Sequence, residues 1–183
     1  MILLYSIMHF LNFNGKLIDA ASPVIGAENR GLRYGDGLFE TLKFTNNQVL
    51  LFDEHIARLF KGMNSLQIEI PKHFTPEKIH EQVIQLVKKN RQQKARIRLM
   101  VVRGNGGLYD AENNNPLYMI QSWELPGTNG MLNVNGLQLC IYHDARKMAD
   151  QFSNVKHNNY LPYFMGALEA KNKKCNDAII LNN

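Results

Sequence analysis

The residues from Asn29 to Thr41 read NRGLRYGDGLFET and contain the strongest fold signal in the chain. Their three glycines and one aspartate indicate turns, because glycine adopts backbone angles that other residues avoid. The residues from Leu38 to Phe44 then read as a strand. In an alternating strand Glu40 shares a face with apolar residues, so its carboxylate would be buried unless a cation pairs with it. Pairing with Arg30 or Arg33 is one possibility, and a place in a binding site is the other.

The elements on either side of this stretch predict an α+β protein. The dipeptide Asn14-Gly15 favours a tight hairpin turn between two short strands. Two helices with one apolar face each are expected further on. Asp53 is a candidate N-cap for the first helix, and Thr75 and Pro76 suit the N-cap and first turn of the second. Further strands are expected at residues 49–52, 95–103 and 117–123.

The composition of residues 125–136, rich in Gly, Pro and Asn, indicates a linker between two domains. An N-terminal α+β domain with hairpins and two helices would occupy residues 1–124. A second domain would begin at residue 137 and continue to residue 183. Its expected elements are a strand at 137–142, a helix at 159–171 and a strand at 178–181.

Charge and cysteine content exclude several classes of protein. The net charge of +5 is spread over 183 residues with acids and bases interleaved, so we expect no nucleic-acid partner. Cys140 and Cys175 are far apart, which predicts neither a disulfide nor a metal site and suits a cytoplasmic location. Residues 1–8 are apolar but lack the basic region and cleavage site of a signal peptide. A buried strand is therefore expected there, and no membrane contact.

Two further motifs complete a pattern with the stretch at 29–41. The residues from Glu54 to Leu59 read EHIARL, and those from Val155 to Leu161 read VKHNNYL. In this order and spacing the three motifs resemble the class IV aminotransferases, enzymes of fold type IV that use pyridoxal 5'-phosphate. The family includes branched-chain and D-amino acid aminotransferases and 4-amino-4-deoxychorismate lyase. The resemblance covers nearly the whole chain, and it implies a D-amino acid aminotransferase-like fold whose second domain begins a barrel-like α/β structure.

The resemblance implies a cofactor site around Lys156. This residue matches the family lysine that holds pyridoxal 5'-phosphate through an imine and then moves protons at the substrate Cα. Arg58 matches the arginine that binds the cofactor phosphate, where a planar guanidinium can make two charge-assisted bonds. Tyr160 is a further candidate for cofactor contact. No metal ligand is expected.

The resemblance also implies a substrate site. Phe39 would form its wall and Glu40 a polar contact, with Tyr109 as a further candidate. Arg98 matches an arginine of branched-chain aminotransferases that faces the substrate. Arg103 matches one of D-amino acid aminotransferases that holds a substrate carboxylate, and it is the preferred carboxylate ligand. Because five positions separate the two arginines, they should point to opposite faces of an uninterrupted strand.

The specific reaction depends on short runs of sequence. Residues 156–159, KHNN, and residues 103–107, RGNGG, resemble the lyase, which releases 4-aminobenzoate and pyruvate. Tyr160-Leu161 instead resembles the branched-chain enzymes. The interpretation leans to the lyase, with an amino acid aminotransferase of branched-chain or D-amino acid type as the alternative.

Members of the family extend beyond the position of Asn183, and the glutamate that pairs with the pyridine nitrogen of the cofactor would lie past it. We therefore expect the chain to be a fragment of a larger enzyme. The alternative of another class is a non-catalytic remnant that only dimerises or binds a ligand. The family also implies a homodimer in which residues of one subunit close the site of the other.

Overall fold

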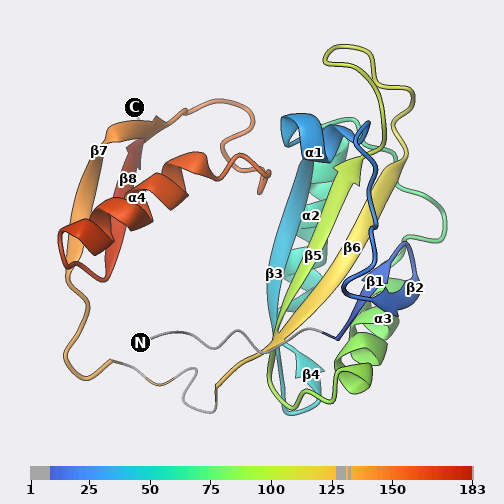
Figure 1. Ribbon diagram of the computed structural model, residues 1–183, viewed down its shortest axis with the longest axis horizontal. Helices are drawn as coiled ribbons and strands as arrows, with labels where there is room; N and C mark the ends of the chain where they lie inside the picture. Colours follow the sequence, from blue (N-terminus) through green and yellow to red (C-terminus); the bar gives the residue numbers. More distant parts are fainter. Residues whose placement is uncertain (1–8, 127–130, 132, 183) are drawn as a thin grey trace. The chain divides into compact units, whose positions relative to one another are not determined.

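The computed structural model describes residues 9–126, 131 and 133–182, whose elements fall into two compact units (Figure 1). The first unit contains a six-stranded sheet, three helices and the segment Val155–Asn158. The second contains a two-stranded sheet and one helix. The segment Val155–Asn158, expected in the second domain, thus belongs to the first unit. The strand expected at residues 1–8 and part of the linker expected at 125–136 lie outside the described residues.

The sheet of the first unit is antiparallel, with the strand order β2-β1-β6-β5-β3-β4. The predicted hairpin is confirmed, because Asn14 and Gly15 have φ angles of 49° and 87°, as a tight hairpin turn requires. The strands predicted at 95–103 and 117–123 are also confirmed. The strands are β1 (Phe10–Phe13), β2 (Lys16–Asp19), β3 (Gly37–Thr45), β4 (Gln48–Val49), β5 (Ala95–Arg103) and β6 (Pro116–Glu124).

Three helices accompany this sheet: α1 (Arg30–Tyr34), α2 (Phe52–Ser65) and α3 (Pro76–Lys89). The start of α3 is as predicted, with the Thr75 side chain accepting a hydrogen bond from the backbone N–H of Lys78 at 3.3 Å. The start of α2 is not. The helix begins at Phe52, so Asp53 lies in its first turn and is not the N-cap. The strand expected at 49–52 is also shorter than predicted. β4 ends at Val49, and the chain turns before α2 at Leu51, which has a φ of 52°.

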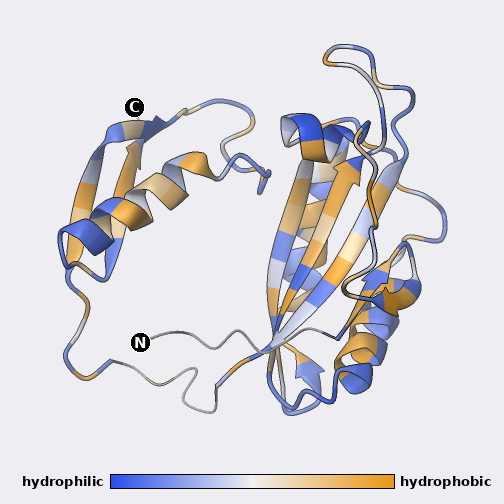
Figure 2. Ribbon diagram, in the orientation of Figure 1, coloured by the Kyte–Doolittle hydropathy of each residue, from blue (hydrophilic) through white to orange (hydrophobic). Residues whose placement is uncertain are grey.

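Helices α2 and α3 pack on one face of the sheet and enclose the core. Figure 2 shows the alternation of apolar and polar residues along β3 and β5 that produces this one-sided burial. Phe39 and Arg98 lie on the opposite face from the helices. The core residues that are almost fully buried include Leu38, Leu42, Met63, Ile79, Val83, Leu86, Ile97, Leu99 and Ile120.

The second unit consists of β7 (Leu139–Lys147), α4 (Leu161–Asn172) and β8 (Asp177–Asn182), with the two strands parallel. Gly166 allows α4 to lie close to β8, because a Cβ there would stand 2.8 Å from the Ile180 side chain. Much apolar surface is exposed, including Leu161, Phe164 and Leu168. Among the described residues, no helix is both long and apolar enough to cross a membrane.

Candidate active site

Lys156 is held against the free edge of β3. The short strand β4 pairs only with Phe44 and Thr45, which leaves the first half of β3 open on that side. The segment around Lys156 pairs with this open part of β3. The N–H of Phe39 donates to the Lys156 carbonyl and the N–H of Asn158 to the Gly37 carbonyl, both at 3.0 Å. These backbone bonds fix the path of the chain at the candidate catalytic lysine.

Gly37 makes this close pairing possible. A Cβ at this position would collide with the carbonyl oxygen of Val101 and would stand 2.8 Å from the side-chain nitrogen of Asn158. Any larger residue would therefore disturb the pairing of β3 with β5 and crowd the side chain of Asn158. The side chain of Lys156 points to the Phe39 ring, with its Nζ 4.4 Å from the ring centroid.

Glu40 is the fully buried carboxylate of the site and binds two side chains of α2, an arginine and a histidine. The Arg58 guanidinium donates from Nε to Oε1 at 2.6 Å and from Nη2 to Oε2 at 2.5 Å. His55 Nδ1 lies 2.7 Å from the same Oε2. Glu40 thus pairs with neither Arg30 nor Arg33, the partners considered from sequence; Arg30 pairs with Asp36 and Arg33 with Glu28.

Arg58 has one side in the protein and one side in solvent. Its side chain is 48 % exposed, whereas that of Glu40 is 0 % exposed. The hydrogen bonds to Glu40 raise the pKa of the Arg58 guanidinium, which keeps its charge permanent. Arg58 and Lys156 both border a shallow hollow that is too narrow to enclose a water molecule, together with Leu38, Phe39, Glu40, Leu59 and Gly62. The structure therefore brings the two predicted cofactor residues together.

Arg98 reaches the same aromatic ring as Lys156. Its guanidinium carbon lies 4.4 Å from the Phe39 ring centroid, the same distance as the Lys156 amine. Such contacts between a cation and a ring stabilise the arrangement by roughly 0.5–2 kcal/mol each. Phe39 therefore contacts two predicted site residues.

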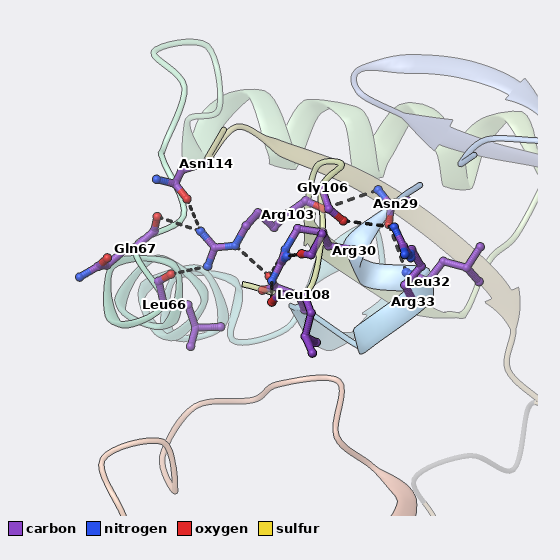
Figure 3. A network of polar contacts seen from close by, with 12 residues as sticks. Asn29, Arg30, Leu32, Arg33, Leu66, Gln67, Arg103, Gly106, Leu108 and Asn114 are labelled. Carbon is purple, nitrogen blue, oxygen red and sulfur yellow. Dashed lines mark hydrogen bonds and ion pairs between the residues drawn. The ribbon is translucent and has the colours of Figure 1, made fainter. Parts of the chain in front are cut away.

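Arg103 is the last residue of β5 and lies on the opposite face from Arg98, as the spacing predicts. Figure 3 shows its guanidinium between Leu66, Gln67 and Asn114. The strand pairs with β3 and β6 without a bulge, so nothing brings the two arginines into one pocket. The Arg103 side chain is only 12 % exposed. Its guanidinium donates to Asp36 at 2.9 Å, to the Leu66 carbonyl at 2.6 Å, to the Gln67 carbonyl at 3.3 Å and to the Asn114 side chain.

Arg30 completes this second cluster from α1. It donates to the same Asp36 oxygen as Arg103 at 2.9 Å, and to the carbonyls of Gly107 and Leu108. The cluster thereby ties the loop after β5 to α1 and to the end of α2. Tyr109, a predicted substrate contact, is 95 % exposed in this loop. The structure does not bring Tyr109 or Arg103 to the hollow at Lys156.

His157 and Tyr160 both follow Lys156 closely in the sequence, but they lie in different units of the structure. His157 follows Lys156 on the edge of β3, opposite Leu38. Tyr160 belongs to the second unit, where it precedes α4 and is 59 % exposed. Its predicted cofactor contact stays a prediction.

Two residues of these clusters were not predicted from the sequence: His55, which shares the Glu40 carboxylate with Arg58, and Asp36, which binds Arg30 and Arg103. His55 stands three positions before Arg58 on α2, a spacing that places two side chains on one helix face. That signal was available, because both residues belong to the motif at 54–59. Asp36 gave no such signal, since an aspartate between glycines ordinarily indicates a turn.

Known proteins resemble the chain over most of its length. The family described as amino-transferase class IV matches residues 37–183. A putative branched-chain-amino-acid aminotransferase of Methanocaldococcus jannaschii is 30% identical over 173 residues, which is 93% of this chain and 58% of that protein. An aminodeoxychorismate lyase of Vibrio harveyi is 24% identical over 156 residues, covering 84% of this chain and 56% of that protein.

Solved structures show the same fold. The branched-chain amino acid aminotransferase of Escherichia coli superposes with a TM-score of 0.83 at 18% identity, and the match covers 96% of this chain and 60% of that one. The chain thus spans about three-fifths of the length of these relatives. With a family match over residues 37–183 and the fold in agreement, the chain belongs to the class IV aminotransferases, whose cofactor is pyridoxal 5'-phosphate.

Proposed function

We propose that the protein is a pyridoxal 5'-phosphate enzyme that transfers the amino group of an amino acid, with Lys156 as its catalytic residue. The observation that carries this proposal is the convergence of Lys156 and Arg98 on the Phe39 ring, each at 4.4 Å from its centroid. An amine and a fixed cation on one aromatic wall suit a substrate that has an amino group and a carboxylate on the same carbon.

The residues around the hollow fit the cofactor. Lys156 offers the amine that would bind its aldehyde, and Arg58 offers a half-exposed guanidinium for its phosphate. When bound, pyridoxal 5'-phosphate supplies an electron sink for the bonds at the substrate Cα. Lys156 would then move the proton at that carbon, because its amine is released when the substrate amine takes its place.

Arg98 is the better candidate for the substrate carboxylate in the described structure. It lies beside Phe39, whereas the donors of Arg103 are taken up by four groups of the protein. The preference for Arg103 is therefore replaced by one for Arg98. Because Arg98 is the position that resembles branched-chain enzymes, this geometry favours an aminotransferase for amino acids with apolar side chains.

The second candidate function is that of 4-amino-4-deoxychorismate lyase. It is favoured by residues 156–159 and 103–107, which resemble the lyase, and by the similarity to the Vibrio harveyi lyase over 84% of this chain. Both reactions would use Lys156 in the same way at first. They differ in the product, a keto acid for the aminotransferase and 4-aminobenzoate with pyruvate for the lyase.

The test has two stages. The protein is treated with pyridoxal 5'-phosphate and borohydride, and peptide mass mapping identifies the labelled lysine. We expect the label on Lys156 and none in Lys156→Ala. Amino transfer from a branched-chain amino acid and release of 4-aminobenzoate are then assayed side by side. A folded protein without a Lys156 label would overturn the proposal and favour a non-catalytic chain that only dimerises or binds a ligand.

We also propose that the protein acts as a homodimer in the cytoplasm. The family resemblance supports the dimer. Cys140 and Cys175 are both free thiols, which suits a reducing compartment. Sedimentation at several concentrations would test the dimer, and a monomer throughout would contradict it.

A further inference from the structure

We propose that Glu40 is a positioning residue, which holds the Arg58 guanidinium so that its remaining edge meets the phosphate of the cofactor. This inference rests on the proposed function and deepens it. It reassigns Glu40, which the sequence suggested as a substrate contact, to a role that acts through Arg58.

The carboxylate of Glu40 is buried, and both of its oxygens are engaged by protein donors. Its side chain is 0 % exposed, and its two oxygens take hydrogen bonds of 2.5–2.7 Å from Arg58 and His55. A carboxylate can only accept, so the proton shared with His55 belongs on the histidine Nδ1. Glu40 thus has no oxygen turned to a ligand, and its contacts all serve to hold α2 side chains.

The hydrogen bonds determine which edge of Arg58 faces outward. Glu40 engages Nε and Nη2, so the edge that carries Nη1 is not turned toward the carboxylate. The side chain remains 48 % exposed and lines the hollow with Lys156. Two charge-assisted bonds from one planar group fix its orientation as well as its position.

Fixing an arginine before the ligand arrives lowers the entropy lost on binding. A free arginine on a helix surface has many rotamers, and ordering one on binding costs roughly 0.5–1.5 kcal/mol, whereas a preformed fork avoids that cost. The pair of Arg33 with Glu28 gives the contrast within the same chain. Its carboxylate is 74 % exposed and its arginine makes one bond of 2.9 Å to it, so neither partner is fixed by burial.

The sign of one mutational effect separates positioning from simple charge. A buried negative charge beside Arg58 repels a phosphate, so removing it should strengthen phosphate binding if only charge matters. If position matters more, the Glu40→Gln change should weaken phosphate binding. The amide keeps the shape of the side chain but presents an N–H group to donors of Arg58 and His55.

The experiment compares pyridoxal 5'-phosphate with pyridoxal, which lacks the phosphate. Binding of each aldehyde to Lys156 is titrated by absorbance, and the ratio of the two dissociation constants measures the phosphate preference. A general loss of structure would weaken both aldehydes together and leave the ratio unchanged. Arg58→Lys shows how far the phosphate preference falls when the guanidinium is removed. Glu28→Gln is the matched control, because Glu28 is an exposed carboxylate paired with an arginine.

We expect Glu40→Gln to lower the phosphate preference about tenfold, the size of one charge-assisted hydrogen bond. Glu28→Gln should not change it, and Glu40→Gln should add little in the Arg58→Lys background. An unchanged or higher preference in Glu40→Gln would overturn the inference while leaving the proposed function intact. If wild-type protein binds neither aldehyde at Lys156, the proposed function itself fails. Should Glu40→Gln not fold, His55→Gln provides the test, with a smaller decrease expected and no decrease overturning the inference.

Discussion

Two carboxylates near the start of β3 each bind two basic side chains, and the two clusters differ in how much of those side chains remains exposed to solvent. Asp36 accepts from Arg30 and Arg103, whose side chains are 11 % and 12 % exposed. Glu40 accepts from His55 and Arg58, of which Arg58 is 48 % exposed. In the first cluster the carboxylate is one of several acceptors around buried arginines. In the second it is the acceptor, within the part of the chain that the structure describes, for an arginine that reaches solvent.

The difference shows how to distinguish an arginine that holds the fold from one that can hold a ligand. Arg103 uses its donors on four groups of the protein, three of them outside its carboxylate partner. Among the described residues, Arg58 bonds through Nε and Nη2 to Glu40 and has a 3.3 Å contact with His55. Both residues were candidates for anion binding from the sequence. Exposure and the remaining donors make Arg58 the stronger one.

The largest effect is expected from a substitution that breaks the cluster of Asp36 with Arg30 and Arg103. Asp36→Asn would leave two nearly buried guanidinium groups without their shared counter-charge, which should lower the free energy of unfolding by about 3–5 kcal/mol. Urea denaturation followed by circular dichroism would measure the change. Asp19→Asn is the control, because Asp19 is exposed and its bond from the Ala21 N–H can be kept by an amide oxygen. Equal losses for the two variants would contradict the structural role of the Asp36 cluster.

A crossed pair of lysine substitutions sharpens the comparison. Arg103→Lys should lower the free energy of unfolding by roughly 1.5–3 kcal/mol, because an ammonium cannot reach the acceptors that the guanidinium fork spans. Arg58→Lys should cost less than about 1 kcal/mol, because that side chain is half exposed. The preference for pyridoxal 5'-phosphate over pyridoxal should fall more in Arg58→Lys than in Arg103→Lys. Urea midpoints and aldehyde titrations on both variants measure these effects. A reversed order in either measurement would contradict the division into a structural arginine, Arg103, and a ligand-binding arginine, Arg58.

Local rules predicted the elements whose signals are local. The Asn14-Gly15 turn and the Thr75 cap of α3 depend on one or two residues, and both are present. The placement of Arg98 and Arg103 on opposite faces of β5 was predicted from the two-residue period of a strand. The three motifs at 29–41, 54–59 and 155–161 together indicated the family, because their order and spacing are specific where each motif alone is not.

The features that sequence did not predict depend on contacts between distant residues. Nothing near Glu40 indicates that its partners lie 15 and 18 positions later, since that pairing requires α2 to pack on β3. The addition of Val155–Asn158 to the edge of β3 likewise joins residues more than a hundred positions apart. The short helix α1 was missed, although Asn29 as N-cap and Gly35 in the left-handed region are its usual end signals.

Gly37 connects the two clusters, since it lies between Asp36 and the part of β3 that contains Glu40. Gly37→Ala should lower the free energy of unfolding by about 1–3 kcal/mol through overpacking. It should also reduce the borohydride label on Lys156, because the added methyl group shifts β3 against β5 and crowds Asn158, which is bonded to Gly37 next to the lysine. Gly26→Ala is the control, as a Cβ there meets nothing within 4 Å. Full labelling in Gly37→Ala would show that the edge pairing does not position the lysine.

The smallest expected effect concerns the pair of Glu28 with Arg33, which shares its chemistry with the Glu40 pair but lies in solvent. Glu28→Gln should change the free energy of unfolding by no more than about 0.5 kcal/mol, because water replaces the lost contact at both partners. Thermal or urea unfolding at low and high salt measures this. A loss as large as that of Glu40→Gln would mean that pairing alone fixes an arginine. A negligible loss would assign that role to the burial of the carboxylate, which excludes water as a competing partner.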